Sequence, residues 1–414
     1  MNEITVKDPE VDISEYPSSP RYDEWGVKEA TVYNTRISGD PDGRSATDIW
    51  KQKREDMSKE DLREDEEKFL GFLSERGHIS AFYQSNVGLV YEVPRSTTLF
   101  LCSFDFPKYL QQSQRYTKAR DFISYSRSQE VEEIFKKQSE LYNNMIENEI
   151  PKEDARYILP LGTAAEHIHQ NTNLAGLMNI HRVIKSESSL LPKITEDIFY
   201  KSVEKLEEKD PELFNEKIMD GLIEADKGYP VANMFSDENR WVNEVLDDYD
   251  LDKPVGEFRY TVDERLKQRA EDFQDEALTF LNLGDSLEEV KGYITSMSIS
   301  AWHQFMRNDT VKNSIESVYD AAERGEMIVP PSIEKSNYEE NYIDLFKESM
   351  ELYRKRGGSE NKGEAVELVP HGLDLGIAFS LDGFNLIKGF LPDRTQEAAQ
   401  WEIRDIARHI EKGI

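Results

Sequence analysis

Apolar residues recur at helical spacing in several segments of the chain. Residues 129–148 carry them at every third or fourth position, and residues 66–76, 172–184 and 338–356 show the same pattern. Such spacing gives each helix one apolar face, which packs against a core. A charge-rich stretch, residues 197–227, is also predicted to be helical. The chain is therefore predicted to be rich in amphipathic helices.

Two other segments show different patterns. Residues 87–103 are rich in Val, Tyr, Thr and Phe, and Pro94 interrupts the run. Because β-branched and aromatic residues are typical of strands, we expect two strands there, or one interrupted strand. Residues 1–65 are polar, contain many Pro, Ser and Asp residues, and lack a sustained period. They are predicted to form an extension that wraps the body or stays partly mobile.

The two halves of the chain repeat an order of segments. The long helix of each half is followed by a short segment that ends in proline, Asp154–Pro160 in the first half and Glu364–Pro370 in the second. The two prolines are 210 residues apart, and Gly77 and Gly284 are 207 apart. A nearly constant offset indicates a tandem duplication, although chance periodicity is the alternative because few identical residues match. The predicted parts are a polar extension (1–65), a first repeat (66–227), a connecting segment (228–265) and a second repeat (266–414).

Charge limits the partners of the chain. Its 414 residues include 82 Asp and Glu against 51 Lys and Arg, which gives a net charge of −31. Such a surface repels nucleic acid and anionic membranes, so we expect neither as a partner, and a phosphate-bearing ligand needs a local basic pocket. No apolar run is long enough to span a bilayer, and the N-terminal residues lack the apolar core of a signal peptide. A cytoplasmic location is therefore predicted.

Thiol and metal chemistry have little support in the sequence. Cys102 is the single cysteine and lies in an apolar run, which predicts a buried and unreactive thiol. One cysteine excludes an internal disulfide and a cysteine-based zinc site. Glu166–His169 contains two imidazoles, but no third ligand follows by spacing. We therefore expect no metal site.

Polar and cationic residues cluster in short motifs. They are Gly77–Ser80, Gln111–Tyr116, Ala155–Pro160 and Asn173–Asn179 in the first half, and Trp302–Arg307, Arg394 and Ala399–Ile403 in the second. Together these motifs resemble the signature segments of the flavin-dependent thymidylate synthases, which methylate dUMP with a flavin, a folate and a nicotinamide. The resemblance implies an α+β fold with two tandem copies of a helix-flanked sheet domain, each similar to one synthase subunit.

The chain departs from the family pattern at the Arg-His-Arg triplet that grips the flavin. Ser103-Phe104-Asp105 stands at this place in the first half, and Arg307-Asn308-Asp309 in the second. The Ser113–Tyr116 loop is kept only in the first half, whereas Arg394 and Gln400 are kept only in the second. The resemblance therefore predicts one composite nucleotide site made by both halves.

The resemblance gives the kept residues specific roles. A phosphate dianion in an acidic protein needs several arginines and backbone donors, and methylation at C5 of uracil needs a fixed positive charge beside the ring. Arg394 is implied to be catalytic. The residues implied to bind dUMP are Gln112, Ser113, Gln114, Arg115, Arg156, Gln304 and Arg307. Those implied to bind the flavin are His78, Ser80, Gln111, Asn173 and Asn179.

The same resemblance implies FAD as cofactor, NADPH and methylenetetrahydrofolate as co-substrates, and a homodimer of pseudo-dimers. Simpler interpretations of the residues stay open. Arg115 and Arg156 can make structural ion pairs, and Arg394 can pair with Glu397 or Glu402. Serine and asparagine often cap helices. The alternative function is a catalytically inactive homologue that binds a nucleotide or serves as a scaffold.

Overall fold

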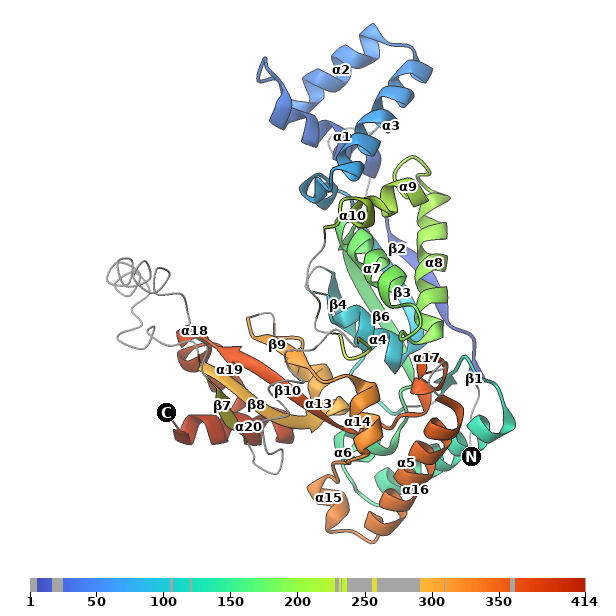
Figure 1. Ribbon diagram of the computed structural model, residues 1–414, viewed down its shortest axis with the longest axis vertical. Helices are drawn as coiled ribbons and strands as arrows, with labels where there is room; N and C mark the ends of the chain where they lie inside the picture. The colour runs from blue at the N-terminus through green and yellow to red at the C-terminus, as the bar shows by residue number, and fades with distance from the viewer. Residues whose placement is uncertain are drawn as a thin grey trace. The chain divides into compact units, whose positions relative to one another are not determined.

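The computed structural model describes residues 6–16, 25–104, 107–119, 121–227, 231, 233–236, 255–258, 291–308, 310–357 and 362–413. The chain divides into two compact units that interleave along the sequence. Unit 1 comprises residues 1–129, 162–231 and 357–367, and unit 2 comprises residues 130–161, 232–356 and 368–414. Each unit contains helices and one four-stranded antiparallel sheet (Figure 1). The predicted mixture of helices and sheet is confirmed.

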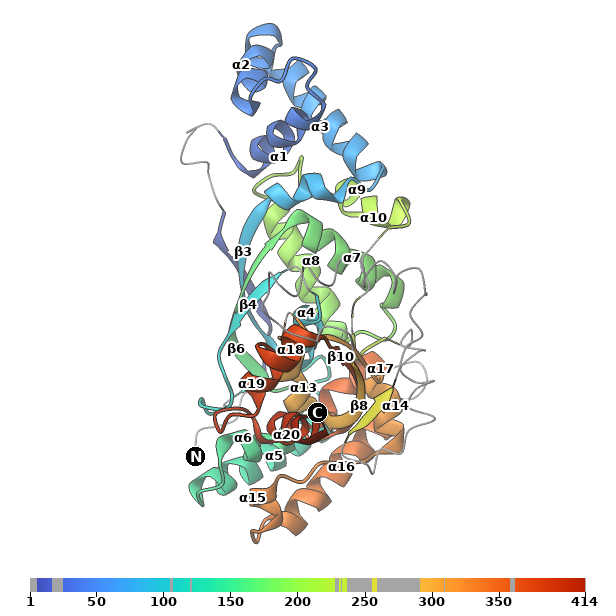
Figure 2. The ribbon, with the colours of Figure 1, turned by 90° about the vertical axis from the view of Figure 1, so that its left-hand side faces the viewer.

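The sheet of unit 1 carries its core on one face. Its order is β2 (Glu10–Glu15), β3 (Asn86–Pro94), β6 (Ala164–Asn173) and β4 (Lys108–Gln111). Alternate side chains of β3, including Leu89 and Tyr91, are fully buried, as expected for a strand with one face on the core. Helices α7 (Leu174–Glu187) and α8 (Lys193–Glu207) lie along one side of the curved sheet (Figure 2).

The expected second strand within residues 87–103 is wrong. Strand β3 ends at Pro94, and the next residues form helix α4 (Arg95–Cys102). Pro94 is the N-cap of this helix, where a missing backbone N–H does not interrupt hydrogen bonding. The Thr97 hydroxyl contacts the Thr195 hydroxyl of α8 at 2.8 Å, so packing decides the conformation of residues whose intrinsic preference is for strands.

The polar N-terminal segment is more regular than its sequence predicted. It contains strand β2 and three helices, α1 (Val27–Arg36), α2 (Ala46–Asp56) and α3 (Lys59–Glu75). Ser45 and Ser58 cap α2 and α3 by accepting a hydrogen bond from the amides of Asp48 and Asp61. The remaining short elements of this unit are β1 (Val6–Lys7), η1 (Ile37–Gly39), η2 (Ile79–Gln84), β5 (Phe122–Ile123), α9 (Glu216–Met219) and α10 (Gly221–Glu224).

Gly77 of the Gly77–Ser80 motif ends helix α3. Its φ is +59°, its amide donates to Ser74 O at 2.8 Å, and the His78 amide donates to Leu73 O at 2.9 Å. This pair of bonds is a Schellman motif, in which the left-handed residue is usually glycine. A Cβ at this position would lie 2.9 Å from the Cβ of Ala225. The glycine of the motif thus has a structural role.

Unit 2 is built around a sheet with the same strand arrangement. Its order is β7 (Gly256–Phe258), β8 (Lys291–Ser298), β10 (Asp374–Leu381) and β9 (Lys312–Ile315). The helices that follow or cover these strands are α13 (Ile299–Phe305), α14 (Val318–Arg324), α15 (Pro331–Glu334), α18 (Gly383–Ile387), α19 (Phe390–Arg394) and α20 (Trp401–Gly413). Gly284, one of the two glycines used for the predicted offset, lies outside the described residues.

The two long helices predicted from sequence are confirmed and pack together in unit 2. They are α5 (Gln129–Glu147) and α16 (Glu339–Gly357), which lie side by side in both views (Figures 1 and 2). Gln138 donates to the Ser349 hydroxyl at 3.1 Å, and that hydroxyl donates to Leu368 O at 2.7 Å. Among the helices described, none is long and apolar enough to cross a membrane.

Each long helix is followed by the same series of elements at a constant spacing. The first series is α6 (Lys152–Ala155), η3 (Arg156–Ile158) and β6; the second is α17 (Lys362–Ala365), η5 (Val366–Leu368) and β10. Each element of the second series begins 210 residues after its counterpart. The order of elements and the strand order thus recur along the chain.

Backbone hydrogen bonds around the two prolines recur with the same offset. In unit 2, Leu161 N donates to Val369 O at 2.8 Å and His371 N donates to Leu159 O at 2.9 Å. The donors of the two bonds are 210 residues apart, and so are the acceptors, so each bond is the counterpart of the other. Likewise, Gly162 N donates to Glu367 O within unit 1, and Gly372 N donates to Tyr157 O within unit 2, both at 2.8 Å.

Substituting Gly77 with alanine should lower the free energy of unfolding by about 1–2 kcal/mol, because alanine resists a positive φ and its Cβ would crowd Ala225. The matched control is Gly39→Ala, where an added Cβ meets nothing within 4 Å. Urea unfolding of both variants measures the difference. Equal effects at the two sites would contradict the structural role of Gly77.

Glu367 should make stability depend on pH. Its carboxylate accepts the Tyr125 amide at 2.8 Å, but its other oxygen is buried without a hydrogen-bond partner among the described residues. Burial therefore raises its pKa from 4.5 to about 7. Because the folded-state pKa is the higher one, its stabilising contribution is present below pH 4.5 and is lost as the pH rises through 7.

Glu367→Gln removes this titration and keeps the size of the side chain. Relative to wild type, the variant should gain about 3 kcal/mol in unfolding free energy between pH 4.5 and pH 8, measured by urea unfolding. A difference between the two proteins that stays constant over this range would show that Glu367 does not titrate as inferred.

Candidate functional site

Four of the predicted site residues lie in unit 2. Gln304 is on α13, Arg307 follows it and is exposed, Arg156 begins η3, and Arg394 ends α19. The Arg394 guanidinium donates to Asn308 Oδ1 at 2.5 Å. The structure thus brings Arg394 to the turn that contains Arg307. The Gln304 amide nitrogen is buried without a hydrogen-bond partner among the described residues.

An aromatic cluster holds the end of α13 and the start of α19 together. The ring of Phe305 contacts Phe379 of β10 with centroids 5.0 Å apart, and Phe390 of α19 at 5.4 Å. All three side chains are almost fully buried, and the tilted ring geometry is favourable. Because α19 starts on this cluster, its last residue, Arg394, projects to the turn after α13.

A buried polar network joins the Ala155–Pro160 and Ala399–Ile403 motifs. The Tyr157 hydroxyl donates to Glu402 and accepts a hydrogen bond from Gln400 Nε2 at 2.6 Å. Glu402 also accepts the Ser298 hydroxyl at 2.6 Å and the Ser298 amide at 2.8 Å. The rings of Tyr157 and Trp401 stack with centroids 6.3 Å apart. Motifs from opposite halves of the sequence therefore meet in one unit.

The network surrounds the Glu402 carboxyl group and affects its pKa. Burial raises the pKa of the Glu402 carboxyl, while the hydrogen bonds from Ser298, Tyr157 and Gln400 oppose the rise. Ser298 is also the N-cap of α13, where its hydroxyl accepts the Ala301 amide at 3.0 Å. The network therefore fixes the start of α13 relative to the start of α20.

The neighbours of the arginines bear on the simpler interpretation of their roles. Glu397 pairs with Arg404 and Arg408, and Glu402 accepts the network just described. Arg394 donates to the neutral Asn308. Arg156 is buried, and its Nε donates to Glu153 O at 3.2 Å. Both arginines are thus held by hydrogen bonds within the protein, and their roles toward a nucleotide stay predictions.

The loop predicted to bind phosphate lies in unit 1, directly after β4. Ser113 O accepts the amides of Tyr116 and Thr117, and Ser113 Oγ accepts the Arg115 amide at 3.3 Å. The Arg115 guanidinium lies 5.5 Å from the Tyr116 ring centroid. Ser113 is exposed, so its hydroxyl faces solvent at the edge of a compact turn.

Three glutamines flank this turn in different environments. Gln112 is exposed, whereas Gln114 is buried and donates to Ala164 O at 3.4 Å. Gln111 ends β4, and both polar atoms of its side chain are buried without a hydrogen-bond partner in the described part of unit 1. Such groups are costly unless a ligand or water satisfies them. Gln111 is therefore the strongest ligand candidate of the loop.

The other residues predicted to bind flavin have local contacts of their own. Asn173 caps α7 by accepting the Gly176 amide at 2.9 Å, and Asn179 accepts Arg182 Nε at 3.2 Å. The exposed His78 ring stacks on Phe72 with centroids 6.4 Å apart, and Ser80 is exposed on η2. The cap explains Asn173 without a ligand, as the simpler interpretation allowed.

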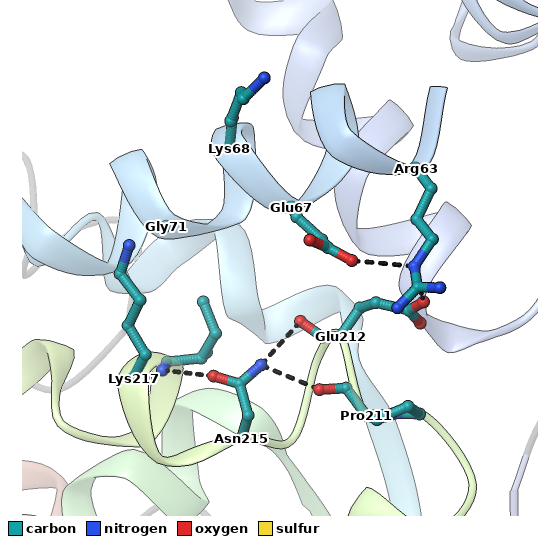
Figure 3. Close-up of a pocket in the computed structure, with 9 residues that line it drawn as sticks. Arg63, Glu67, Lys68, Gly71, Pro211, Glu212, Asn215 and Lys217 are labelled. Carbon is teal, nitrogen blue, oxygen red and sulfur yellow. Dashed lines mark hydrogen bonds and ion pairs between the residues drawn. The ribbon is translucent and has the colours of Figure 1, made fainter. Parts of the chain in front are cut away.

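A pocket of about 370 Å³ lies elsewhere in unit 1 (Figure 3). It lies between α3 and the segment around Asn215, and Arg63 on its wall pairs with Glu67 and Glu212. None of the predicted site residues lines it. The two lysines of its wall, Lys68 and Lys217, pair with Glu64 and Glu75 outside the lining, so we assign the pocket no ligand.

Cys102 and the histidine pair complete the predicted chemistry. Cys102 is half-buried at the end of α4, and the expected strand around it is a helix. His169 shares a hydrogen bond of 2.8 Å with Ser14, and His167 is exposed with a φ of +47°. Among the residues that the structure describes, no three potential metal ligands lie together.

Sequence reasoning missed two contributors to this arrangement. The sequence identifies Asn308 only as a departure from the triplet, and the motifs do not include Ser298. A serine directly before an apolar segment is a weak N-cap signal, which marks Ser298 as a possible helix start. Nothing in the sequence near Asn308 indicates its partner, because Arg394 lies 86 residues away.

The family of the chain follows from its sequence. Residues 24–189 and 288–413 match the model of Thy1, described as thymidylate synthase complementing protein. The match covers well over half of the chain, so the chain belongs to this family. The resemblance to the flavin-dependent thymidylate synthases is thereby confirmed.

Solved structures add a weaker likeness. The chain is similar to the UMP/dUMP methylase PolB from Streptomyces cacaoi bound with 5-Br dUMP, with a TM-score of 0.40 and 14% identity over 54% of this chain and 99% of that one. The 5-Br UMP complex gives a TM-score of 0.38 and 14% identity over 55% and 100% of the two chains. No curated protein matches the sequence. The family assignment therefore rests on the family model.

Tyr157→Phe removes the hydroxyl that joins Glu402 and Gln400 and should lower the unfolding free energy by about 1–3 kcal/mol, because it leaves buried partners unsatisfied. Tyr338→Phe is the matched control, since its hydroxyl bonds Asn144 O near the surface. Thermal unfolding compares the two. If both variants have the same melting temperature, the network does not stabilise unit 2.

Proposed function

We propose that the chain is a flavin-dependent thymidylate synthase that methylates dUMP to dTMP, with methylenetetrahydrofolate as carbon donor and NADPH as reductant. Membership of the Thy1 family supports this reaction class. The observation that carries the proposal is the position of Arg394 at the turn after α13, beside the segment that contains Gln304 and Arg307. The resemblance implies that Arg394 is catalytic and that Gln304 and Arg307 bind the nucleotide.

Arg394 would act on the uracil ring. C5 of uracil becomes nucleophilic when negative charge builds on the ring and its carbonyl oxygens, and its attack on the electrophilic one-carbon unit then consumes that charge. A guanidinium keeps its charge at any physiological pH, and fixed in place it stabilises that charge in the transition state. The unsatisfied Gln304 amide nitrogen supplies a further donor to the nucleotide.

Arginines and the Ser113 turn would bind the phosphate. Arg115, Arg156 and Arg307 provide charge-assisted donors in a chain whose net charge would otherwise repel a dianion. Gln112, Ser113 and Gln114 belong to the same predicted set. That all of them serve one composite site is a prediction from the sequence.

The residues present fit a flavin in part. The buried amide of Gln111 has no hydrogen-bond partner among the described residues, and it suits the polar edge of the flavin ring. His78 and Ser80 are exposed and therefore accessible to a cofactor. Asn173 already caps a helix, which leaves Asn179 as the other amide candidate. When bound, FAD would take hydride from NADPH and pass on the one-carbon unit and electrons. Gln111, His78 and Ser80 would orient it.

We also propose that the chain arose by tandem duplication of a synthase-like subunit, with repeats at 66–227 and 266–414. Within these repeats the strand orders β3-β6-β4 and β8-β10-β9 correspond, and the 210-residue spacing and the paired hydrogen bonds around Pro160 and Pro370 also support this origin. Family sites shared between subunits would then become sites shared between repeats, and a homodimer of such chains would replace the family tetramer.

A second candidate is a catalytically inactive homologue that binds a nucleotide or serves as a scaffold. The observation in its favour is the lost Arg-His-Arg triplet, which reads Ser-Phe-Asp at 103–105 and Arg-Asn-Asp at 307–309. A colourless purified protein that binds dUMP but makes no dTMP would support it.

Arg394→Ala should lower kcat for dTMP formation by about 10²–10³-fold, since it removes one fixed donor to the developing charge. Arg404→Ala is the matched control, because that arginine pairs with Glu397. The assay combines purified yellow protein, NADPH, methylenetetrahydrofolate and dUMP, and follows flavin bleaching and dTMP. If wild type makes dTMP and both variants keep its kcat, Arg394 has no catalytic role.

A further inference from the structure

Asn308 has a geometry suited to aiming the Arg394 side chain. Its Nδ2 donates to Phe305 O at 2.6 Å, and its Oδ1 accepts the Arg394 guanidinium at 2.5 Å. The first bond sets which way the carboxamide faces, because only the nitrogen can donate to a carbonyl. The oxygen is thereby turned toward Arg394.

The turn that carries Asn308 is itself tied down. The Asn308 amide donates to Phe305 O at 3.1 Å, and Phe305 belongs to the buried aromatic cluster with Phe390. Two residues later, Thr310 Oγ1 donates to Asn385 Oδ1 at 2.8 Å, and Asn385 Nδ2 donates to Thr310 O at 3.0 Å. The acceptor of Arg394 is therefore attached to the core on both sides.

We propose that Asn308 is a positioning residue, which sets the direction of the Arg394 guanidinium for the reaction. This inference rests on the proposed function. An amide oxygen orients a guanidinium without adding negative charge, so this contact does not weaken the field at the substrate. Asn308 stands where the family pattern has the histidine of the triplet. The asparagine that replaces this histidine thus has a function of its own, which is to orient Arg394.

The test measures kcat and the KM for dUMP of wild type, Asn308→Ala, Arg394→Ala and the double variant. Asn308→Ala should lower kcat by about tenfold to a hundredfold with little change in KM, as expected when an aligned group loses its position. In the double variant, kcat should equal that of Arg394→Ala within about twofold, because Asn308 acts only through Arg394.

Asn148→Ala is the matched control. It removes an exposed asparagine side chain whose Nδ2 also donates to a main-chain oxygen, Asn144 O of helix α5 at 2.9 Å, and it should keep the wild-type kcat. Asn308→Asp serves if the alanine variant does not fold, because it keeps the size of the side chain. Its carboxylate would offset the guanidinium charge, so kcat should again fall, and the fall should again vanish in the Arg394→Ala background.

The outcomes separate the inference from the function on which it rests. If wild type forms no dTMP, the proposed function fails and the inference fails with it. If wild type is active and Asn308→Ala keeps its kcat, only the inference is overturned. A double variant much slower than Arg394→Ala also overturns it, because Asn308 would then act independently.

Discussion

The buried Glu402 carboxylate is the constraint on which the arrangement of unit 2 depends. An unpaired carboxylate in this position would carry a desolvation penalty of several kcal/mol. Three side chains and one backbone amide satisfy it, and they come from η3, the start of α13 and the segment before α20. These elements are far apart in the sequence. Loss of any one of these hydrogen bonds would leave a buried polar group unsatisfied, which is costly. The three elements therefore keep their positions relative to one another.

The network also explains how the distant Ala399–Ile403 motif can stabilise the candidate site, although none of its residues is predicted to bind the nucleotide or the flavin. Glu402 fixes the Ser298 cap, Ser298 begins α13, and α13 ends at Phe305, three residues before Asn308. Phe305 then contacts Phe390, the first residue of the helix that ends in Arg394. A continuous chain of contacts therefore leads from the Ala399–Ile403 motif to the guanidinium. The motif therefore supports the turn to which Arg394 is bonded.

The sequence predicted those parts of the structure in which local pattern and packing agree. Helices α5 and α16 were foreseen because their apolar faces repeat at helical spacing. Helix α4 was not, because its Thr-Thr-Leu-Phe residues prefer strands and only contacts such as Thr97–Thr195 favour the helix. The N-terminal helices were missed because they are polar, although Ser45 and Ser58 precede acidic residues at the spacing of helix caps.

The candidate site, too, could be predicted from the sequence only in part. A motif in sequence identifies Arg394 as a candidate, but its orientation depends on Asn308, whose contact spans 86 residues. In a chain of net charge −31, a guanidinium needs its direction fixed by hydrogen-bond geometry as well as by charge. Asn308 supplies such geometry, since its nitrogen is already committed to Phe305 O. A neutral histidine also has one donor and one acceptor, but they are fixed on a rigid ring, so the pair of bonds would need a different geometry. The lost histidine and the kept arginine are therefore parts of one local change in chemistry.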